Sequence, residues 1–163
     1  MRVAFCRRGG RSDDGFTLME MLVVIAIIST LAGLLLSGVV VARRKAAEKR
    51  TSMLLVRLAH AIEVYETDFG DYPPGTGDET SGALLYAALR TTSRNGPYIE
   101  LQRKELEDVD LDGVEEIVDT WGYPIRYVHH RHYDDEPGRG KFRVFSVGPD
   151  GEPGTADDLT NWD

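Results

Sequence analysis

The sequence is almost free of cysteine, and no proline precedes residue 73. Of 163 residues only Cys6 is a cysteine, and the first proline is Pro73. A disulfide within the chain is excluded because there is no second thiol, so its loops must be held in another way. A long helix is allowed before Pro73, since every residue there has the backbone N–H that a helix needs.

Basic residues are scarce beyond residue 42. Four of the 19 Lys and Arg residues and three of the 27 Asp and Glu residues lie before residue 43. Residues 43–163 therefore carry 15 basic and 24 acidic side chains, a net charge of −9. Nucleic acid is excluded as a partner because phosphate binding needs a basic face. An acidic, solvated domain fits a cation instead. No nucleophile–base spacing and no phosphate-binding loop appear, so we expect no enzyme.

One apolar segment, residues 16–42, contains a single ionisable side chain, Glu20. At 1.5 Å per residue its length exceeds the ~30 Å hydrocarbon core of a bilayer. A secretory signal peptide has an apolar region of only ~7–15 residues, which argues against cleavage near Ala42. We therefore predict a transmembrane helix over residues 16–42.

The segment Gly15-Phe16-Thr17-Leu18-Met19-Glu20 directly precedes and enters this apolar run. It resembles the prepilin processing motif of type IV pilins and type II secretion pseudopilins. The resemblance implies that prepilin peptidase removes residues 1–15 as a leader by cutting after Gly15 and methylates the new N-terminus, Phe16. Glu20 becomes the fifth residue of the mature chain. The leader would be cytoplasmic and the C-terminal head periplasmic.

Glu20 is the unusual residue of the transmembrane segment. A carboxylate in a membrane helix costs about 2.5–3.5 kcal/mol on insertion scales, so it usually has a partner and a function. The new ammonium on Phe16 of a neighbouring subunit would be such a partner, and a buried ion pair specifies register more than it stabilises. The alternative is a Glu that reaches the membrane interface from one turn inside the helix.

The helix is predicted to continue beyond the membrane to about residue 69. Apolar residues recur at helical spacing, and Gly70 and Pro73-Pro74 end the pattern; these residues are Leu54, Leu55, Leu58, Ile62, Tyr65 and Phe69. A short helix is expected over residues 83–89, and alternation predicts a hairpin of strands 125–128 and 141–147 with a turn at 134–138. The predicted fold class is α+β, type IV pilin-like: a long N-terminal helix packed on a small antiparallel β-sheet.

Three regions therefore make up the predicted head, residues 43–163. They are the helix continuation to about 69, a variable region at 70–118, and a sheet with a metal-binding loop at 119–163. The loop, from Ser146 to Leu159, is rich in glycine and carboxylates, and such oxygen ligands on a flexible backbone suit calcium.

The segment from Trp121-Gly122-Tyr123-Pro124 to Asn161-Trp162-Asp163 resembles the C-terminal half of the major pseudopilins of type II secretion. The resemblance implies that this loop closes around one calcium ion, which takes the place of the disulfide found in many type IV pilins. The implied ligands are the side chains of Asp150, Asp157 and Asp158 and the carbonyl oxygens of Val147 and Thr155. The alternative is a solvated acidic turn.

A second acidic segment has the spacing of a metal-binding loop. The run Asp108-Val109-Asp110-Leu111-Asp112-Gly113 resembles the first half of an EF-hand loop, with Asp119 at its twelfth position. The EF-hand pattern requires Glu there and a pair of flanking helices, and the alternative is an exposed acidic turn.

The histidines at positions 129, 130 and 132 are close enough in sequence to raise the question of a zinc site. Adjacent residues of a strand point to opposite faces, so we interpret this segment as the end of the hairpin.

The resemblance implies a structural subunit of the type II secretion pseudopilus, a periplasmic filament that drives protein export across the outer membrane. It also implies a single-pass inner-membrane location. Its partners would be prepilin peptidase, copies of itself, minor pseudopilins, the inner-membrane secretion platform and membrane lipid. The alternatives are a type IV pilin or minor pseudopilin of a related filament, or a membrane-tethered enzyme or binding domain. The C-terminal loop and the missing cysteine pair favour the pseudopilus.

Overall fold

The computed structural model describes residues 15–132 and 142–162, and the side chains of residues 35–37 are left out of the description. The predicted leader, apart from Gly15, and the predicted turn at 134–138 lie outside the described residues. The chain divides into two compact units after Ala42, and each is described by itself.

Helix α1 (Leu18–Phe69) begins in the first unit. It is long and apolar enough to cross a membrane, and its large apolar side chains at residues 18–34 and 39–41 are exposed. The hydroxyls of Ser29 and Thr30 donate to the carbonyl oxygens of Ile25 and Ala26 at 2.7 and 3.1 Å. The helix therefore satisfies its own polar side chains there, as an apolar environment requires.

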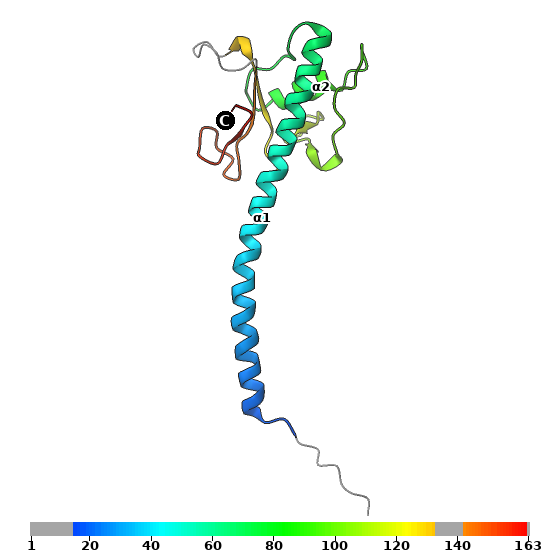
Figure 1. Cartoon of the computed structure of the whole chain (residues 1–163). Helices are drawn as coiled ribbons and strands as arrows, with labels where there is room; N and C mark the ends of the chain where they lie inside the picture. Colours follow the sequence, from blue (N-terminus) through cyan, green and yellow to red (C-terminus); the bar gives the residue numbers. More distant parts are fainter. Residues whose placement is uncertain (1–14, 133–141, 163) are drawn as a thin grey trace, which may run out of the picture. The chain divides into compact units, whose positions relative to one another are not determined.

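In the second unit α1 contributes one face to the hydrophobic core (Figure 1). Leu54, Leu55, Leu58 and Ile62 are buried, which confirms four residues of the predicted stripe, and Tyr65 packs against them at its edge. Burying a side chain of this size stabilises the fold by roughly 1.5–3 kcal/mol. The helix ends where predicted, because Gly70 adopts a φ of +79° and its N–H bonds to the Glu66 carbonyl.

The main sheet has three antiparallel strands in the order β3 (Arg126–His129), β4 (Phe142–Ser146) and β5 (Leu159–Thr160). Strands β3 and β4 confirm the predicted hairpin, with Arg126 opposite Phe145 and His129 opposite Phe142. On β4 alternate residues are buried against the core. Strand β5 was not predicted, because two residues are too few to show alternation.

Between α1 and the main sheet in sequence lie α2 (Ser81–Leu89) and the small hairpin of β1 (Leu106–Glu107) and β2 (Glu116–Ile117). The helix confirms the one expected over 83–89, whereas the hairpin was not predicted. Gly82 allows α2 to approach the sheet, because a Cβ there would come within 2.8 Å of the Ile125 carbonyl oxygen. The fold is therefore the predicted α+β arrangement with one additional small sheet.

Candidate functional site

The N-terminal site begins with a capping box on α1. Thr17 is the residue before the helix, and its N–H and hydroxyl both donate to Glu20 Oε2 at 2.9 Å. The Glu20 N–H donates in return to the Thr17 hydroxyl at 3.3 Å. This reciprocal pair satisfies backbone groups that a helix start leaves free. Glu20 therefore has a local structural role besides any role in pairing.

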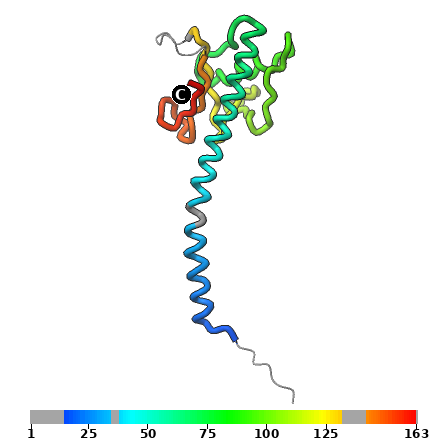
Figure 2. The backbone as a smooth tube through the Cα atoms, viewed as in Figure 1, coloured from blue at the N-terminus to red at the C-terminus, as the bar shows by residue number. Residues whose placement is uncertain are grey.

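The C-terminal loop, residues 147–158, connects β4 to β5 (Figure 2, orange to red). The two strands hold its ends together, since Ser146 pairs with Leu159. At Gly148 the backbone has a φ of +69°, and a Cβ would lie 2.4 Å from the Asp157 carbonyl oxygen. Glycine is required there because the two ends of the loop approach each other too closely for a side chain.

Hydrogen bonds orient the carboxylates of this loop. The Thr155 hydroxyl donates to Asp157 Oδ1 at 2.7 Å, the Gly154 N–H donates to Asp158 Oδ2 at 2.7 Å, and the Glu152 N–H donates to Asp150 Oδ1 at 2.9 Å. The Thr155 hydroxyl is the main cause that holds the pKa of Asp157 below its usual value. The loop thus favours the ionised form of Asp157, and all three predicted carboxylates lie on this short segment.

Asp119, a predicted ligand of the second site, has a different position. It is 4% exposed, and its Oδ1 accepts the N–H groups of Trp121 and Tyr123 at 2.8 and 3.0 Å. Its Oδ2 accepts the Ser146 hydroxyl at 2.6 Å, and Ser146 Oγ accepts the Gly148 N–H at 3.1 Å. Asp119 therefore anchors the start of the C-terminal loop through Ser146. Ser146 was not predicted to have this role, because in the sequence it is only a small polar residue at an inward position of β4.

Two groups of acidic or histidine side chains in the described part of the chain bring one ligand atom each within 4.8 Å of one another. The first is Asp108, Asp110 and Glu116, at the β1–β2 hairpin. Asp112 does not join it, and neither Asp119 nor the C-terminal carboxylates form such a group in the described residues. The structure therefore places Glu116, and not Asp119, with the predicted aspartates.

The second group is Asp71, His129 and His130. The two imidazole rings lie 4.3 Å apart, so the expectation that they face opposite sides is wrong. His129 ends β3 and His130 begins the 3-10 helix η2 (His130–His132), where strand alternation no longer applies.

Hydrogen bonds favour a structural role for His129. Its Nδ1 accepts the Arg131 N–H at 3.1 Å and its Nε2 lies 3.3 Å from Asp71 Oδ1. Burial, the largest cause, lowers the pKa of His129. A neutral imidazole whose Nδ1 accepts a hydrogen bond carries its proton on Nε2, so no lone pair is left for a metal. The guanidinium of Arg131 also bonds to Asp71, at 2.7 Å.

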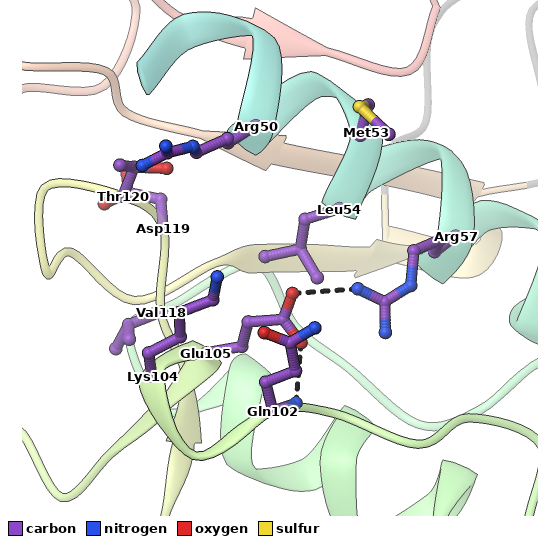
Figure 3. Close-up of a pocket in the computed structure, with 10 residues that line it drawn as sticks. All are labelled: Arg50, Met53, Leu54, Arg57, Gln102, Lys104, Glu105, Val118, Asp119 and Thr120. Atoms are coloured by element: carbon purple, nitrogen blue, oxygen red, sulfur yellow. Dashed lines mark hydrogen bonds and ion pairs between the residues drawn. The ribbon is translucent and has the colours of Figure 1, made fainter. Parts of the chain in front are cut away.

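A groove of about 340 Å³ lies beside α1, between Arg50 and Arg57 on one side and Gln102–Glu105 and Val118–Thr120 on the other (Figure 3). Glu105 makes two contacts there. Arg57 pairs with Glu105 at 2.8 Å, and the Gln102 N–H donates to the second oxygen of Glu105 at 2.7 Å. These contacts join α1 to the 102–105 turn, which is a structural arrangement.

A long helix with a capped, apolar N-terminal half and a small α+β head defines a pilin-like protein. Residues 10–36 match the prokaryotic N-terminal methylation motif, and residues 39–162 match the family described as type II secretion system protein G. The chain therefore belongs to the type II secretion system protein G family, the major pseudopilins. It is a structural subunit in protein secretion and not an enzyme.

Two relatives of similar sequence agree with this assignment. The type II secretion system core protein G of Aeromonas hydrophila is 34% identical over 157 residues, which cover 93% of this chain and 94% of that protein. Its counterpart from Escherichia coli K12 is 32% identical over 156 residues and covers 95% and 94%. The crystal structure of the major pseudopilin from enterohaemorrhagic Escherichia coli aligns with a TM-score of 0.46 at 23% identity, over 74% and 90% of the two chains.

The family and the motif also bear on the processing, assembly and location of the chain. The methylation motif implies processing by a prepilin peptidase, and a pseudopilin implies assembly into a filament. An apolar N-terminal helix with this motif is consistent with the inner membrane and periplasm.

Proposed function

We propose that the chain is cut after Gly15, is methylated on Phe16, and polymerises into the periplasmic filament of a type II secretion pseudopilus. The head would lie in the periplasm, and the subunit would meet minor pseudopilins and the inner-membrane secretion platform. The observation that carries the proposal is the motif at residues 15–20, located at the capped start of an apolar helix in a chain of this family.

Intact-mass analysis of the protein from native membranes tests the processing step. We expect a mass equal to residues 16–163 plus one methyl group, because cleavage and methylation act on the same junction. A mass that includes residues 1–15 would contradict the proposal. A cleaved but unmethylated chain would contradict only the methylation of Phe16.

The subunit's exposed apolar surface supports assembly. Phe16 is 75% exposed and Leu18 is 83% exposed, and the large apolar side chains of residues 19–34 and 39–41 are likewise exposed. In the membrane, lipid covers this surface, and in a filament the helices of neighbouring subunits would replace the lipid. Glu20 would then exchange one of its contacts with Thr17 for the ammonium of Phe16 on the next subunit.

We also propose that the C-terminal loop binds one calcium ion. Its ligands would be the carboxylates of Asp150, Asp157 and Asp158 and the carbonyl oxygens of Thr155 and Val147. When bound, calcium supplies positive charge that neutralises the carboxylates and cross-links the loop. Two observations support a fit: β4 and β5 hold the loop ends together, and the Thr155 hydroxyl keeps Asp157 in the ionised form that calcium requires.

The calcium proposal predicts a calcium-dependent melting temperature for the mature chain in detergent. A ligand bound only by the folded state stabilises it by about 2.7 kcal/mol at one hundred times Kd, so Tm should be higher in calcium than in chelator. Magnesium should substitute poorly, because it demands tighter octahedral geometry and loses its waters reluctantly.

Two matched variants test which carboxylates cause the calcium-dependent rise in Tm. Asp158→Asn keeps an acceptor for the Gly154 N–H but removes the charge, and it should abolish most of the calcium-dependent rise in Tm. Glu152→Gln removes an exposed charge of the same loop outside the proposed ligand set and should leave the rise unchanged. The same Tm in calcium and in chelator for the unsubstituted chain would contradict the proposal.

A further inference from the structure

The β1–β2 hairpin gathers three carboxylates without any residue of the C-terminal loop. Glu107 pairs with Glu116, so residues 108–115 form the loop of this hairpin. The register brings Glu116, at the start of β2, back to Asp108 and Asp110, and one oxygen of each lies within 4.8 Å of the others. The cluster thus depends on the pairing of the two strands.

One of these oxygens is buried and has no hydrogen-bond partner. Asp108 Oδ1 is shielded from solvent and accepts no hydrogen bond, while the other oxygen, Oδ2, accepts the Gly113 N–H at 3.1 Å. A buried acceptor without a donor costs about 1–3 kcal/mol, and more when it is charged. The oxygen of Asp108 that remains for an outside ligand is therefore Oδ1.

Glu116 adds a second buried carboxylate to the cluster. It is 4% exposed, and its Oε2 accepts the Val109 N–H at 2.8 Å. A carboxylate removed from water is stabilised in its charged form by hydrogen bonds and by a nearby positive charge. The only charges beside it in the cluster are two more carboxylates, which repel it.

No basic side chain compensates this charge within the described ranges. Arg103 pairs with Glu115 and Arg90 lies over the Tyr86 ring. No Lys or Arg of residues 15–132 and 142–162 forms an ion pair with Asp108, Asp110 or Glu116. The buried oxygen and the unbalanced charge together point to a cation that is not part of the chain.

We propose that Asp108, Asp110 and Glu116 bind a second divalent cation of the calcium class. The ligands are all oxygen atoms, which favour hard ions and disfavour zinc or copper. Calcium takes 6–8 oxygens, so water would complete its shell. The set differs from an EF-hand, because the third carboxylate comes from strand β2 at Glu116 and neither Asp112 nor Asp119 takes part. The ion would tie the loop to the strand that follows it.

Calcium binding to the full mature chain in detergent tests this site by itself. The protein carries Asp150→Asn and Asp158→Asn, so that the C-terminal loop does not contribute and failure of that site cannot affect the result. Equilibrium dialysis with radioactive calcium, at about 0.15 M KCl to screen diffuse attraction, should find one ion per chain. The expected Kd is near the ~10⁻⁴–10⁻³ M range of extracellular modules.

Two further substitutions in this background identify the ligands. Asp110→Asn, at an exposed position that should tolerate the change, should weaken calcium binding about tenfold or more, because affinity follows the number of charged ligands. Asp112→Asn removes the same charge from the same loop, keeps an acceptor for the Val114 N–H, and should leave Kd unchanged. Circular dichroism confirms that each variant is folded.

The possible outcomes distinguish a specific calcium site from non-specific attraction of calcium to an acidic loop. No bound calcium in the background protein would overturn the proposal. Equal weakening by Asp110→Asn and Asp112→Asn would also overturn it, because a solvated acidic loop responds only to the loss of charge. Selective loss with Asp110→Asn would support it.

Discussion

Replacing Gly15 with leucine is expected to leave the leader on the chain and to abolish filament assembly. The peptidase must bring the backbone of the Gly15–Phe16 junction into its active site, and a large side chain would obstruct that approach. A Cβ at Gly15 meets no atom of residues 16–132 or 142–162 within 4 Å. A clash inside the subunit therefore cannot explain the loss, which must arise at the peptidase. Without cleavage there is no Phe16 ammonium to pair with Glu20.

Intact mass of the membrane protein and the amount of sheared filament measure the two parts of this result. Gly10→Leu, the same change elsewhere in the leader, is the matched control and should be processed normally. If Gly15→Leu yields a mature chain beginning at Phe16, the proposed cleavage by prepilin peptidase is wrong.

Glu20→Gln is expected to be inserted and cleaved but to assemble poorly. Glutamine serves in a capping box as well as glutamate does, so the contacts with Thr17 can persist and α1 should still start at Leu18. The substitution therefore removes the charge and little else. An unpaired buried charge, here the Phe16 ammonium, costs about 3–5 kcal/mol, which corresponds to at least ~100-fold weaker subunit association.

Comparison with Glu20→Ala separates pairing from capping. Alanine removes both the charge and the cap, and losing a cap costs a further ~0.5–2 kcal/mol of helix stability. Electron microscopy of filaments and intact mass of the subunit should show processed chains but few filaments for Glu20→Gln. Normal filament levels with Gln and a defect only with Ala would assign Glu20 to capping and remove the pairing interpretation.

Local patterns explain which elements were predictable. The limits of α1 follow from the apolar stripe through Leu54, Leu58 and Ile62 and from Gly70, whose conformation ends a helix. The β3–β4 hairpin follows from alternation in residues 142–146. Strands β1, β2 and β5 have two residues each, and a pair of residues has no period to detect.

The candidate sites also differ in whether a local sequence pattern could reveal them. The processing motif is linear, and so is the acidic content of the C-terminal loop, whose calcium ligands stay a prediction. The hairpin cluster is different, since sequence spacing selected Asp119 as the distant ligand while the β1–β2 register brings Glu116 there. Asp119 is instead bonded to Ser146 across the fold.

The sequence by itself determined the long apolar helix, the N-terminal methylation motif, the fold class and the family resemblance, because each depends on neighbouring residues or on a short period along the chain. Only the tertiary structure decided that Glu116 completes an acidic cluster, that His129 is held by Asp71 and Arg131, and that Ser146 links Asp119 to the C-terminal loop. The contacts of His129 with Asp71 and of Ser146 with Asp119 join residues far apart in sequence, and the acidic cluster forms only when β1 pairs with β2. Their partners are set by strand register and by the packing of the core, and neither leaves a local pattern in the sequence.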